Sequence, residues 1–430
     1  MLYTYYGDDF TGSTDVLEQL GANGIPAVLF VGPPTPAQLA AFPDVEAIGI
    51  AGDSRSRSPE WMSANLPGIF RSLQQFDAPI THYKVCSTFD SSPTSGSIGR
   101  AIEIGREVFA PPFVPIVVGA PHLRRYVAFG NLFAAAPDGT VQRIDRHPMA
   151  HHPVTPMHEA DLRLHLAAQT STKIGLIDDP TLRSGCASAT LDALRAAARQ
   201  AVVFDTIDEQ TQSVVGQLLL GCAKKEPLFA VGSSGLTAAL VSAWDRLGLI
   251  APIHSSPLSL ARPLLVVSGS CSTVTERQLR HALAHGHHGV AINPASLLNP
   301  GNTSYAATLE AAAQSLAAGR DTILYTALGT PATPALGDFL GVALGTLLRD
   351  LLSRSASAAE PVHRVLVCGG DTASHAVQQL GIHALTWAAN IQPGGPLCRA
   401  HADSLLDGLE LVLKGGQVGT DNFFDLVRGS

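Results

Sequence analysis

Two adjacent carboxylates, Asp8 and Asp9, stand near the start of the chain between an apolar run and a segment of helical spacing. Residues 2–6 have the pattern of a buried strand, and residues 13–20 that of an amphipathic helix. In open α/β sheets, ligands bind where a strand gives way to a helix. Because a helix cap needs a single oxygen, capping does not explain both acids. The pair is therefore a candidate for general acid–base chemistry, and an ordinary βα turn is the alternative.

Basic and hydroxyl groups follow two later apolar runs. Arg55 lies in a polar loop after one of them, and Lys84 is at the end of the other. Arginine holds a carboxylate or phosphate through two parallel hydrogen bonds. Ser87 and Thr88 begin a loop rich in hydroxyl groups before the predicted helix 98–108, whose N-terminus favours anions. Together these groups predict a site for a polyhydroxylated anion; a solvated surface loop and a Ser-rich connector are the alternatives.

Glycine- and serine-rich turns recur at strand ends in the second half of the chain. Amide and hydroxyl donors at such turns suit a phosphate group, especially where a helix begins. Neither a Walker A loop nor a GxGxxG motif after an early strand is present. A purely structural use of the glycines is the alternative. The candidate phosphate-binding residues are Ser268, Gly269, Ser270, Gly369, Gly370, Asp371, Thr372, Gly394 and Gly395.

Strand-like and helix-like segments alternate along the whole chain. The predicted strands cover residues 2–6, 26–31, 47–50, 79–85, 114–118, 173–177, 201–204, 228–231, 263–267, 289–292, 322–326, 364–368 and 409–413. This pattern predicts an α/β fold with mainly parallel sheets flanked by helices. A chain of 430 residues is too long for one hydrophobic core. The proline-rich stretch 249–263 is the predicted boundary between domains 1–248 and 263–430.

Composition and charge argue against several classes of protein. The net charge of -8, without a basic stripe, argues against nucleic acid as a partner. The six cysteines form no CxxC pair and are typical of reduced cytosolic thiols. Pro148 and Pro153 interrupt the spacing of His147 and His151, so no metal site is predicted there. Because neither a signal peptide nor a membrane-spanning run is found, a cytoplasmic protein with no membrane partner is expected.

Taken together and in order, the motifs resemble those of the four-carbon acid sugar kinase family. They lie at residues 8–12, 84–89 with 96–99, 232–236, 268–272 and 369–372. The resemblance implies an ATP-dependent kinase of short sugar acids that uses Mg²⁺. It also implies an N-terminal substrate domain and a C-terminal nucleotide domain, with the active site in the cleft between them.

By this likeness, the two halves of the chain would face different ligands. Asp8, Asp9, Arg55 and Lys84 would face the acid sugar, while Ser268, the turn 369–372 and Gly394 or Gly395 would face ATP. Our hypothesis is that Asp9 or Asp8 orients or deprotonates the terminal hydroxyl group of the acid. Arg55 and Lys84 would hold its carboxylate.

One departure of this sequence from the motifs of the family bears on the identity of the substrate. Many members carry Asp-Ser-Thr-Leu-Arg-Gly where this chain has Cys86-Ser87-Thr88-Phe89-Asp90 and a longer loop. That form looks more like members that act on 3-oxo acids, the 3-oxo-tetronate kinases and, favoured here, the 3-oxo-isoapionate kinases. A kinase for a non-oxidised four-carbon aldonate, such as threonate or erythronate, is the first alternative.

Two other classes of function remain at this point. A non-catalytic, two-domain binding protein would share the fold, because fold does not determine function. A nicotinamide oxidoreductase would need GxGxxG and an acid about 20 residues later, which this chain lacks in the expected place. Whether the protein forms a homodimer is left open.

Overall fold

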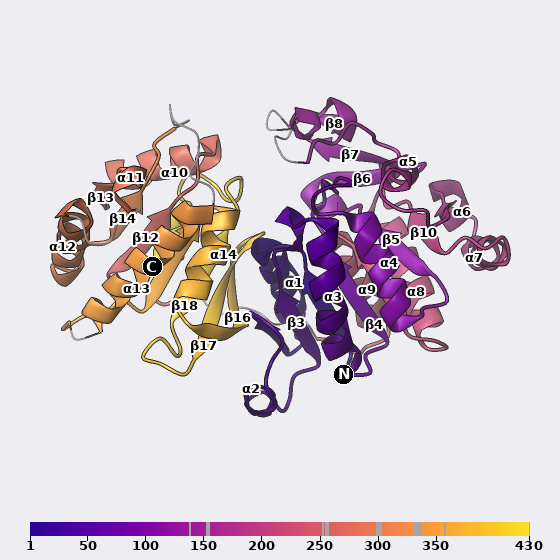
Figure 1. Ribbon diagram of the computed structural model, residues 1–430, viewed down its shortest axis with the longest axis horizontal. Coiled ribbons are helices and arrows are strands. Elements are labelled where there is room, and N and C mark those ends of the chain that lie inside the picture. Colours follow the sequence, from indigo (N-terminus) through magenta and orange to yellow (C-terminus); the bar gives the residue numbers. More distant parts are fainter. Residues whose placement is uncertain are drawn as a thin grey trace. The chain divides into compact units, whose positions relative to one another are not determined.

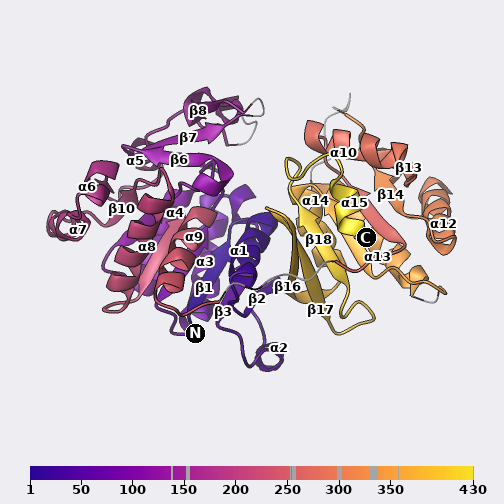
Figure 2. The same cartoon turned by 180° about the vertical axis from the view of Figure 1, so that it is seen from behind.

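The computed structural model describes residues 1–136, 139–151, 155–251, 253, 258–297, 303–329, 338–356 and 358–429, without the side chains of Asp338 and Asp371. Two compact units make up the chain. Unit 1 comprises Met1–Ala27 and Phe42–Pro252, and unit 2 comprises Val28–Ala41 and Ile253–Ser430. Each contains a sheet with helices packed on it, so the predicted α/β class is confirmed (Figures 1 and 2).

The sheet of unit 1 is parallel throughout. Its strand order is β3-β1-β4-β11-β5-β10-β9. These strands are β1 (Tyr3–Gly7), β3 (Ala47–Ala51), β4 (Ile80–Lys84), β5 (Val114–Val117), β9 (Ile174–Ile177), β10 (Ala201–Phe204) and β11 (Leu228–Gly232). The central strands are buried along their length, as expected for a parallel sheet covered on both faces.

Helices cover both faces of this sheet. Because side chains alternate along a strand, Tyr3 of β1 meets Trp244 of α9, whereas Tyr6 meets Phe70 of α3. The helices of unit 1 are α1 (Phe10–Ala22), α3 (Pro59–Gln74), α4 (Ile98–Phe109), α5 (Leu162–Ala167), α6 (Asp179–Arg183), α7 (Ala187–Ala196), α8 (Glu209–Ala223) and α9 (Ser234–Arg246). Short 3₁₀ turns lie at Ser54–Ser56, Pro121–Leu123, Ile144–Arg146 and Pro148–His151.

A small antiparallel sheet accompanies unit 1. It consists of β6 (Arg125–Ala128), β7 (Asn131–Ala135) and β8 (Val141–Arg143). The predicted strands do not include this sheet. His147 and His151 of the histidine-rich stretch follow it, whereas His152 and Pro153 lie outside the described residues.

The sheet of unit 2 is parallel at one end and antiparallel at the other. Its order is β13-β14-β12-β15-β18-β17-β16-β2, with antiparallel pairing from β18 onward. These strands are β2 (Ala27–Phe30), β12 (Leu264–Ser268), β13 (His288–Ala291), β14 (Thr322–Tyr325), β15 (Arg364–Cys368), β16 (Ile382–Gln392), β17 (Gly395–Ala402) and β18 (Glu410–Lys414).

The helices of unit 2 include two that begin at the predicted phosphate turns. They are α2 (Pro36–Ala40), α10 (Thr273–Ala284), α11 (Pro294–Leu297), α12 (Thr303–Ala317), α13 (Asp338–Ser355), α14 (Gly370–Gln379) and α15 (Phe423–Arg428). Leu279 of α10, Phe423 of α15 and Val266 of β12 belong to one buried hydrophobic cluster. Within the described ranges, no helix of the protein is long and apolar enough to span a bilayer.

Candidate active site

Three neighbouring strand ends bring the candidate residues of unit 1 together. In the parallel sheet, Gly7 of β1, Lys84 of β4 and Gly232 of β11 lie opposite one another. Asp8 and Ser233 each follow one of these positions directly. The carboxyl ends of parallel strands share one edge of the sheet, and the sheet therefore places the first motif beside Lys84.

Arg55 links the two adjacent acids. Its Nη2 and Nε donate to the two carboxylate oxygens of Asp8, at 2.8 and 3.2 Å, and its Nη1 lies 3.0 Å from Oδ2 of Asp9. The side chain of Asp8 is 5% exposed, whereas that of Asp9 is 25% exposed. Burial raises the pKa of Asp8 to about 6, against the opposing charge of Arg55. The same acids raise the pKa of Arg55, so the guanidinium stays charged.

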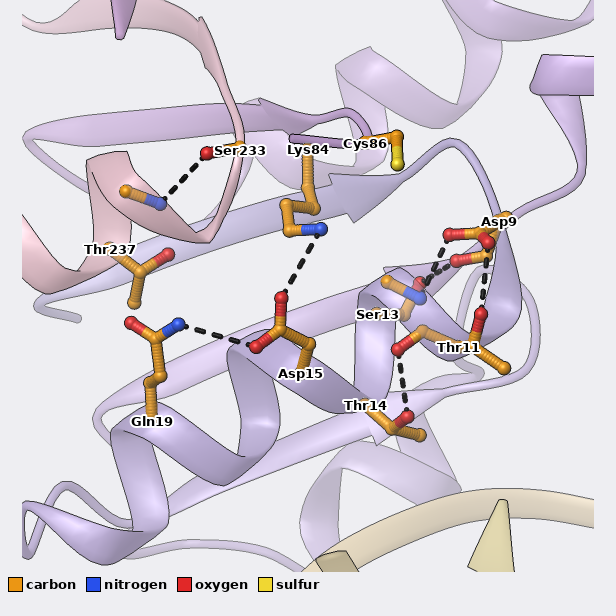
Figure 3. Close-up of polar contacts among 12 residues, drawn as sticks. Asp9, Thr11, Ser13, Thr14, Asp15, Gln19, Lys84, Cys86, Ser233 and Thr237 are labelled. Carbon is orange, nitrogen blue, oxygen red and sulfur yellow. Dashed lines mark hydrogen bonds and ion pairs between the residues drawn. The ribbon is translucent and has the colours of Figure 1, made fainter. Parts of the chain in front are cut away.

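Asp9 is the N-cap of α1. Its Oδ1 accepts the Gly12 amide hydrogen at 2.8 Å and its Oδ2 accepts the Thr11 hydroxyl at 3.0 Å (Figure 3). This is the usual way to satisfy an amide that a helix start leaves without a partner. Asp9 therefore caps the helix and, together with Asp8, holds Arg55, which accounts structurally for both carboxylates.

Lys84 meets a third acid that sequence reasoning did not single out. Its Nζ lies 3.5 Å from Oδ2 of Asp15, and Gln19 donates to the other oxygen of Asp15 at 3.3 Å (Figure 3). A Cβ at Gly12 would collide with Oδ1 of Asp9 and lie 3.0 Å from the lysine nitrogen. Gly12 thus leaves room for the Lys84 ammonium beside the N-terminus of α1.

The loop after β4 is held by its own hydroxyl groups. Thr88 is buried and donates to Asp90 at 2.6 Å, and Thr155 donates to the second oxygen of that acid at 3.2 Å. Ser87 is half-buried. Gly96 has a φ of +58°, and a Cβ there would collide with the carbonyl oxygen of Arg55. The loop is therefore packed against the Arg55 turn, with Thr88 serving the loop itself.

Most of the predicted phosphate residues also converge. Ser268 and Cys368 lie opposite each other at the ends of β12 and β15. A Cβ at Gly269 would collide with the hydroxyl of Thr372, and one at Gly369 would lie 3.5 Å from the amide nitrogen of Ser270. Gly369, with a φ of +115°, precedes α14, which carries no side-chain cap at this end. The structure describes the helical backbone of Gly370 and Asp371 but not the Asp371 side chain.

Gly394 and Gly395 lie at the turn between β16 and β17, where Gln392 pairs with Gly395. A Cβ at Gly395 would lie 2.8 Å from the ring of Phe423. Gly416, which the sequence analysis does not single out, contacts the Ser270 turn, because its carbonyl oxygen accepts a hydrogen bond from the hydroxyl of Ser272.

Comparison with known proteins decides the family. A profile described as a sugar-binding N-terminal domain matches residues 3–240, and one described as a nucleotide-binding C-terminal domain matches residues 265–424. The chain belongs to the four-carbon acid sugar kinase family. The predicted sugar-acid kinase, a phosphotransferase, is thereby confirmed, and the non-catalytic alternative is not supported. Kinase relatives imply ATP as the phosphoryl donor and a small molecule as the substrate.

Named members of this family align over nearly the whole chain. A 3-oxo-isoapionate kinase of Paraburkholderia graminis is 45% identical, with 100% of this chain and 94% of the relative covered. A 3-oxo-tetronate kinase of Pectobacterium atrosepticum is 30% identical, with coverages of 97% and 96%. A crystal structure from Salmonella typhimurium LT2 matches 99% of this chain and 98% of its own, with a TM-score of 0.79 and 26% identity.

Proposed function

We propose that this member of the four-carbon acid sugar kinase family transfers the terminal phosphoryl group of ATP to a hydroxyl group of 3-oxo-isoapionate. The observation that carries the proposal is the 45% identity to a 3-oxo-isoapionate kinase over the whole chain, against 30% to the 3-oxo-tetronate kinases. The Cys86–Asp90 form of the loop after β4 agrees with a 3-oxo acid. The expected acceptor is the terminal hydroxyl group.

In this proposal the acids of unit 1 have separate roles. Asp9 is the more accessible carboxylate, so it orients the acceptor hydroxyl group or takes its proton. Asp8 keeps Arg55 in place through two hydrogen bonds. With three of its five N–H groups on these acids, Arg55 has two left for a substrate carboxylate.

Lys84 is the second basic group of the proposed acid-sugar site. Its ammonium group is buried beside the start of α1, where the helix dipole also favours an anion. Asp15 holds it from the other side. Ser87, which is half-buried at the start of the next loop, is the hydroxyl placed to contact the sugar acid.

The turns of unit 2 fit the phosphates of ATP. Gly269 and Gly369 let the Ser270 and Thr372 turns pack closely together, which would bring two helix N-termini, those of α10 and α14, to the same phosphate groups. Mg²⁺ would neutralise phosphate charge, and it usually binds kinases through substrate phosphates with one or two carboxylates. In the part of the chain that is described, no group of three or more His, Cys, Asp or Glu side chains is arranged to hold a metal ion.

A coupled assay of ADP release tests the proposal. Purified protein with ATP and Mg²⁺ is offered 3-oxo-isoapionate, 3-oxo-tetronate, threonate and erythronate. We expect kcat/KM for 3-oxo-isoapionate to exceed the others by roughly tenfold or more, equivalent to about 1.4 kcal/mol of transition-state binding. Equal or faster turnover of threonate or erythronate would assign the chain to the aldonate kinases instead. The homodimer and the cytoplasmic location stay predictions.

A further inference from the structure

Lys414, at the end of β18, is a fully buried lysine. Its side chain has no exposed surface, and its Nζ donates to the Thr275 hydroxyl and the Gly415 carbonyl oxygen, each at 3.1 Å. The ring of Phe423 lies 5.9 Å away. Among the described residues, no carboxylate forms an ion pair with it. A buried charge without a counter-ion costs several kcal/mol, and such a position calls for a partner anion.

The neighbours of Lys414 on the sheet cannot supply that charge. Ser268, Cys368 and Lys414 lie opposite one another at the ends of β12, β15 and β18. Burial raises the pKa of the Cys368 thiol to about 11, so this sulfur stays protonated at neutral pH. The hydroxyl oxygen of Ser268 is buried and has no hydrogen-bond partner. The Ser268 hydroxyl is thus a buried polar group without a partner, and Lys414, two strands away, is a buried lysine without a paired carboxylate among the described residues.

The helix starts near Lys414 add positive electrostatic potential. Thr275, which accepts the Lys414 hydrogen bond, lies in the first turn of α10, and the start of a helix carries a partial positive charge. The uncapped start of α14, at Gly369, follows the strand next to β18. The Gly416 carbonyl oxygen accepts hydrogen bonds from Ser272 and Thr275 and so joins the loop after Lys414 to α10.

We propose that Lys414 is a positioning residue that supplies the buried counter-charge for the phosphate groups of ATP at the α10 and α14 turns, with Ser268 as a hydrogen-bond donor. This role for Lys414 rests on the proposed function, because it takes ATP as the phosphoryl donor. In a buried, low-dielectric setting a cation acts over several ångströms, so Lys414 need not touch the phosphates to favour them. A purely structural role, in which the lysine only ties the Gly415 loop to α10, is the competing explanation.

Two variants separate charge from tethering. Lys414→Met removes the charge and keeps a side chain of similar length. Thr275→Val removes the hydroxyl that joins α10 to both Lys414 and Gly416 but keeps the lysine. Lys173→Met, at an exposed lysine of unit 1, is the control for loss of one positive charge. Thermal unfolding and the dissociation constants for adenosine, ADP and Mg-ATP are measured for each protein.

If Lys414 acts through its charge, Lys414→Met without nucleotide is at least as stable as the natural protein. Its affinity for Mg-ATP falls by roughly 10- to 100-fold, while its affinity for adenosine is unchanged. Thr275→Val loses stability but keeps the preference for Mg-ATP over adenosine. Ser268→Ala lowers the affinity for Mg-ATP by a smaller factor, which provides a second measurement.

Two results would overturn the inference. One is an affinity of Lys414→Met for Mg-ATP equal to that of the natural protein. The other is that Lys414→Met, without nucleotide, loses as much stability as Thr275→Val, which would make the role of the lysine structural. Failure of Lys414→Met to fold counts as the second result. If the natural protein itself does not bind Mg-ATP, the proposed function fails instead, and the two failures are thus told apart.

Discussion

Asp9 serves two purposes that are usually divided between residues. Its carboxylate caps α1 through the Gly12 amide hydrogen and also lies 3.0 Å from Arg55, with a quarter of the side chain exposed. Capping needs an acceptor oxygen, which an amide also supplies, whereas proton transfer needs the carboxylate charge. An Asn at this position therefore separates the two purposes.

We expect Asp9→Asn to fold normally but to turn over slowly. Asn is as good an N-cap as Asp, so thermal stability changes little. The loss of the charge lowers kcat by roughly 10²-fold or more. The matched control is Asp178→Asn, at the N-cap of α6, where Oδ1 accepts the Thr181 amide hydrogen. Near-normal kcat in Asp9→Asn, measured by ADP release, would remove Asp9 from the chemistry.

Asp8 makes the stability of the protein depend on pH. Burial raises its pKa to about 6, whereas an aspartate in an unfolded chain titrates near about 3.9. Between these values the native state keeps a proton that the unfolded state has lost, so Asp8 reduces native stability as the pH rises from about 4 to about 6. The Asp8→Asn variant has no ionisable group at this position, so it should not show this loss of stability.

Urea unfolding of the natural protein and of Asp8→Asn across that pH range checks whether Asp8 lowers stability as the pH rises. The stability of the variant should rise relative to the natural protein as the pH increases, and the difference should level off above about pH 6. Asp53→Asn, which removes an acid paired with Arg57, serves as the control. Parallel pH profiles for Asp8→Asn and the natural protein would contradict the raised pKa.

At the scale of the element, the start of α1 depends on a glycine. Gly12 is inside the helix, where alanine is normally the more stable residue by about 0.5–1 kcal/mol. Here a methyl group would collide with the Asp9 oxygen that caps the helix and would press on the Lys84 nitrogen. The usual sign of a Gly→Ala change in a helix is therefore reversed.

We expect Gly12→Ala to lower stability and to raise KM for the sugar acid by roughly tenfold, because Lys84 and the Asp9 cap shift together. Gly68→Ala is the matched control. Gly68 lies within α3, and a Cβ there meets no atom within 4 Å. That control should be as stable as the natural protein or more so, with the same KM. Equal stability and equal KM in the two variants would show that the protein relieves the close contact at Gly12 without losing stability or substrate affinity.

How much could be predicted from the sequence differs between kinds of element. Buried parallel strands show as short apolar runs, so residues 79–85 and 364–368 were close to β4 and β15. β16 was missed, because it is only partly buried and its mixed hydropathy does not mark a strand. Helix α3 was missed too, since Pro67 interrupts the pattern within it.

The site residues show the same limit. Asp8, Arg55 and Lys84 could be predicted together, because motifs at the ends of parallel strands meet at one edge of a sheet. Asp15 is one of several polar residues on α1, and only the three-dimensional structure shows that it faces Lys84. Lys414 stands out only because no carboxylate among the described residues pairs with it, and such a lack of a spatial neighbour cannot be read from a sequence.

At the scale of the whole molecule, the chain does not divide at one point. Residues 28–41 belong by contacts to unit 2, although they are flanked in sequence by unit 1. The reason is β2, whose Val28, Leu29 and Phe30 pair with β16, and whose residues are all buried. The domains predicted from the sequence, 1–248 and 263–430, assign β2 to the first domain and β16 to the second. A division at that boundary therefore has a testable consequence.

A fragment of residues 253–430 should therefore associate with itself. Without β2, strand β16 becomes an edge with open backbone donors and acceptors, and such edges pair with other chains. Joining residues 26–41 to the fragment through a Gly/Ser linker restores the pairing of β16 and should lower the self-association. Light scattering after gel filtration measures the oligomeric state of the fragment with and without residues 26–41. If the shorter fragment is a cooperative monomer, β2 contributes little to unit 2, and the boundary predicted from the sequence suffices.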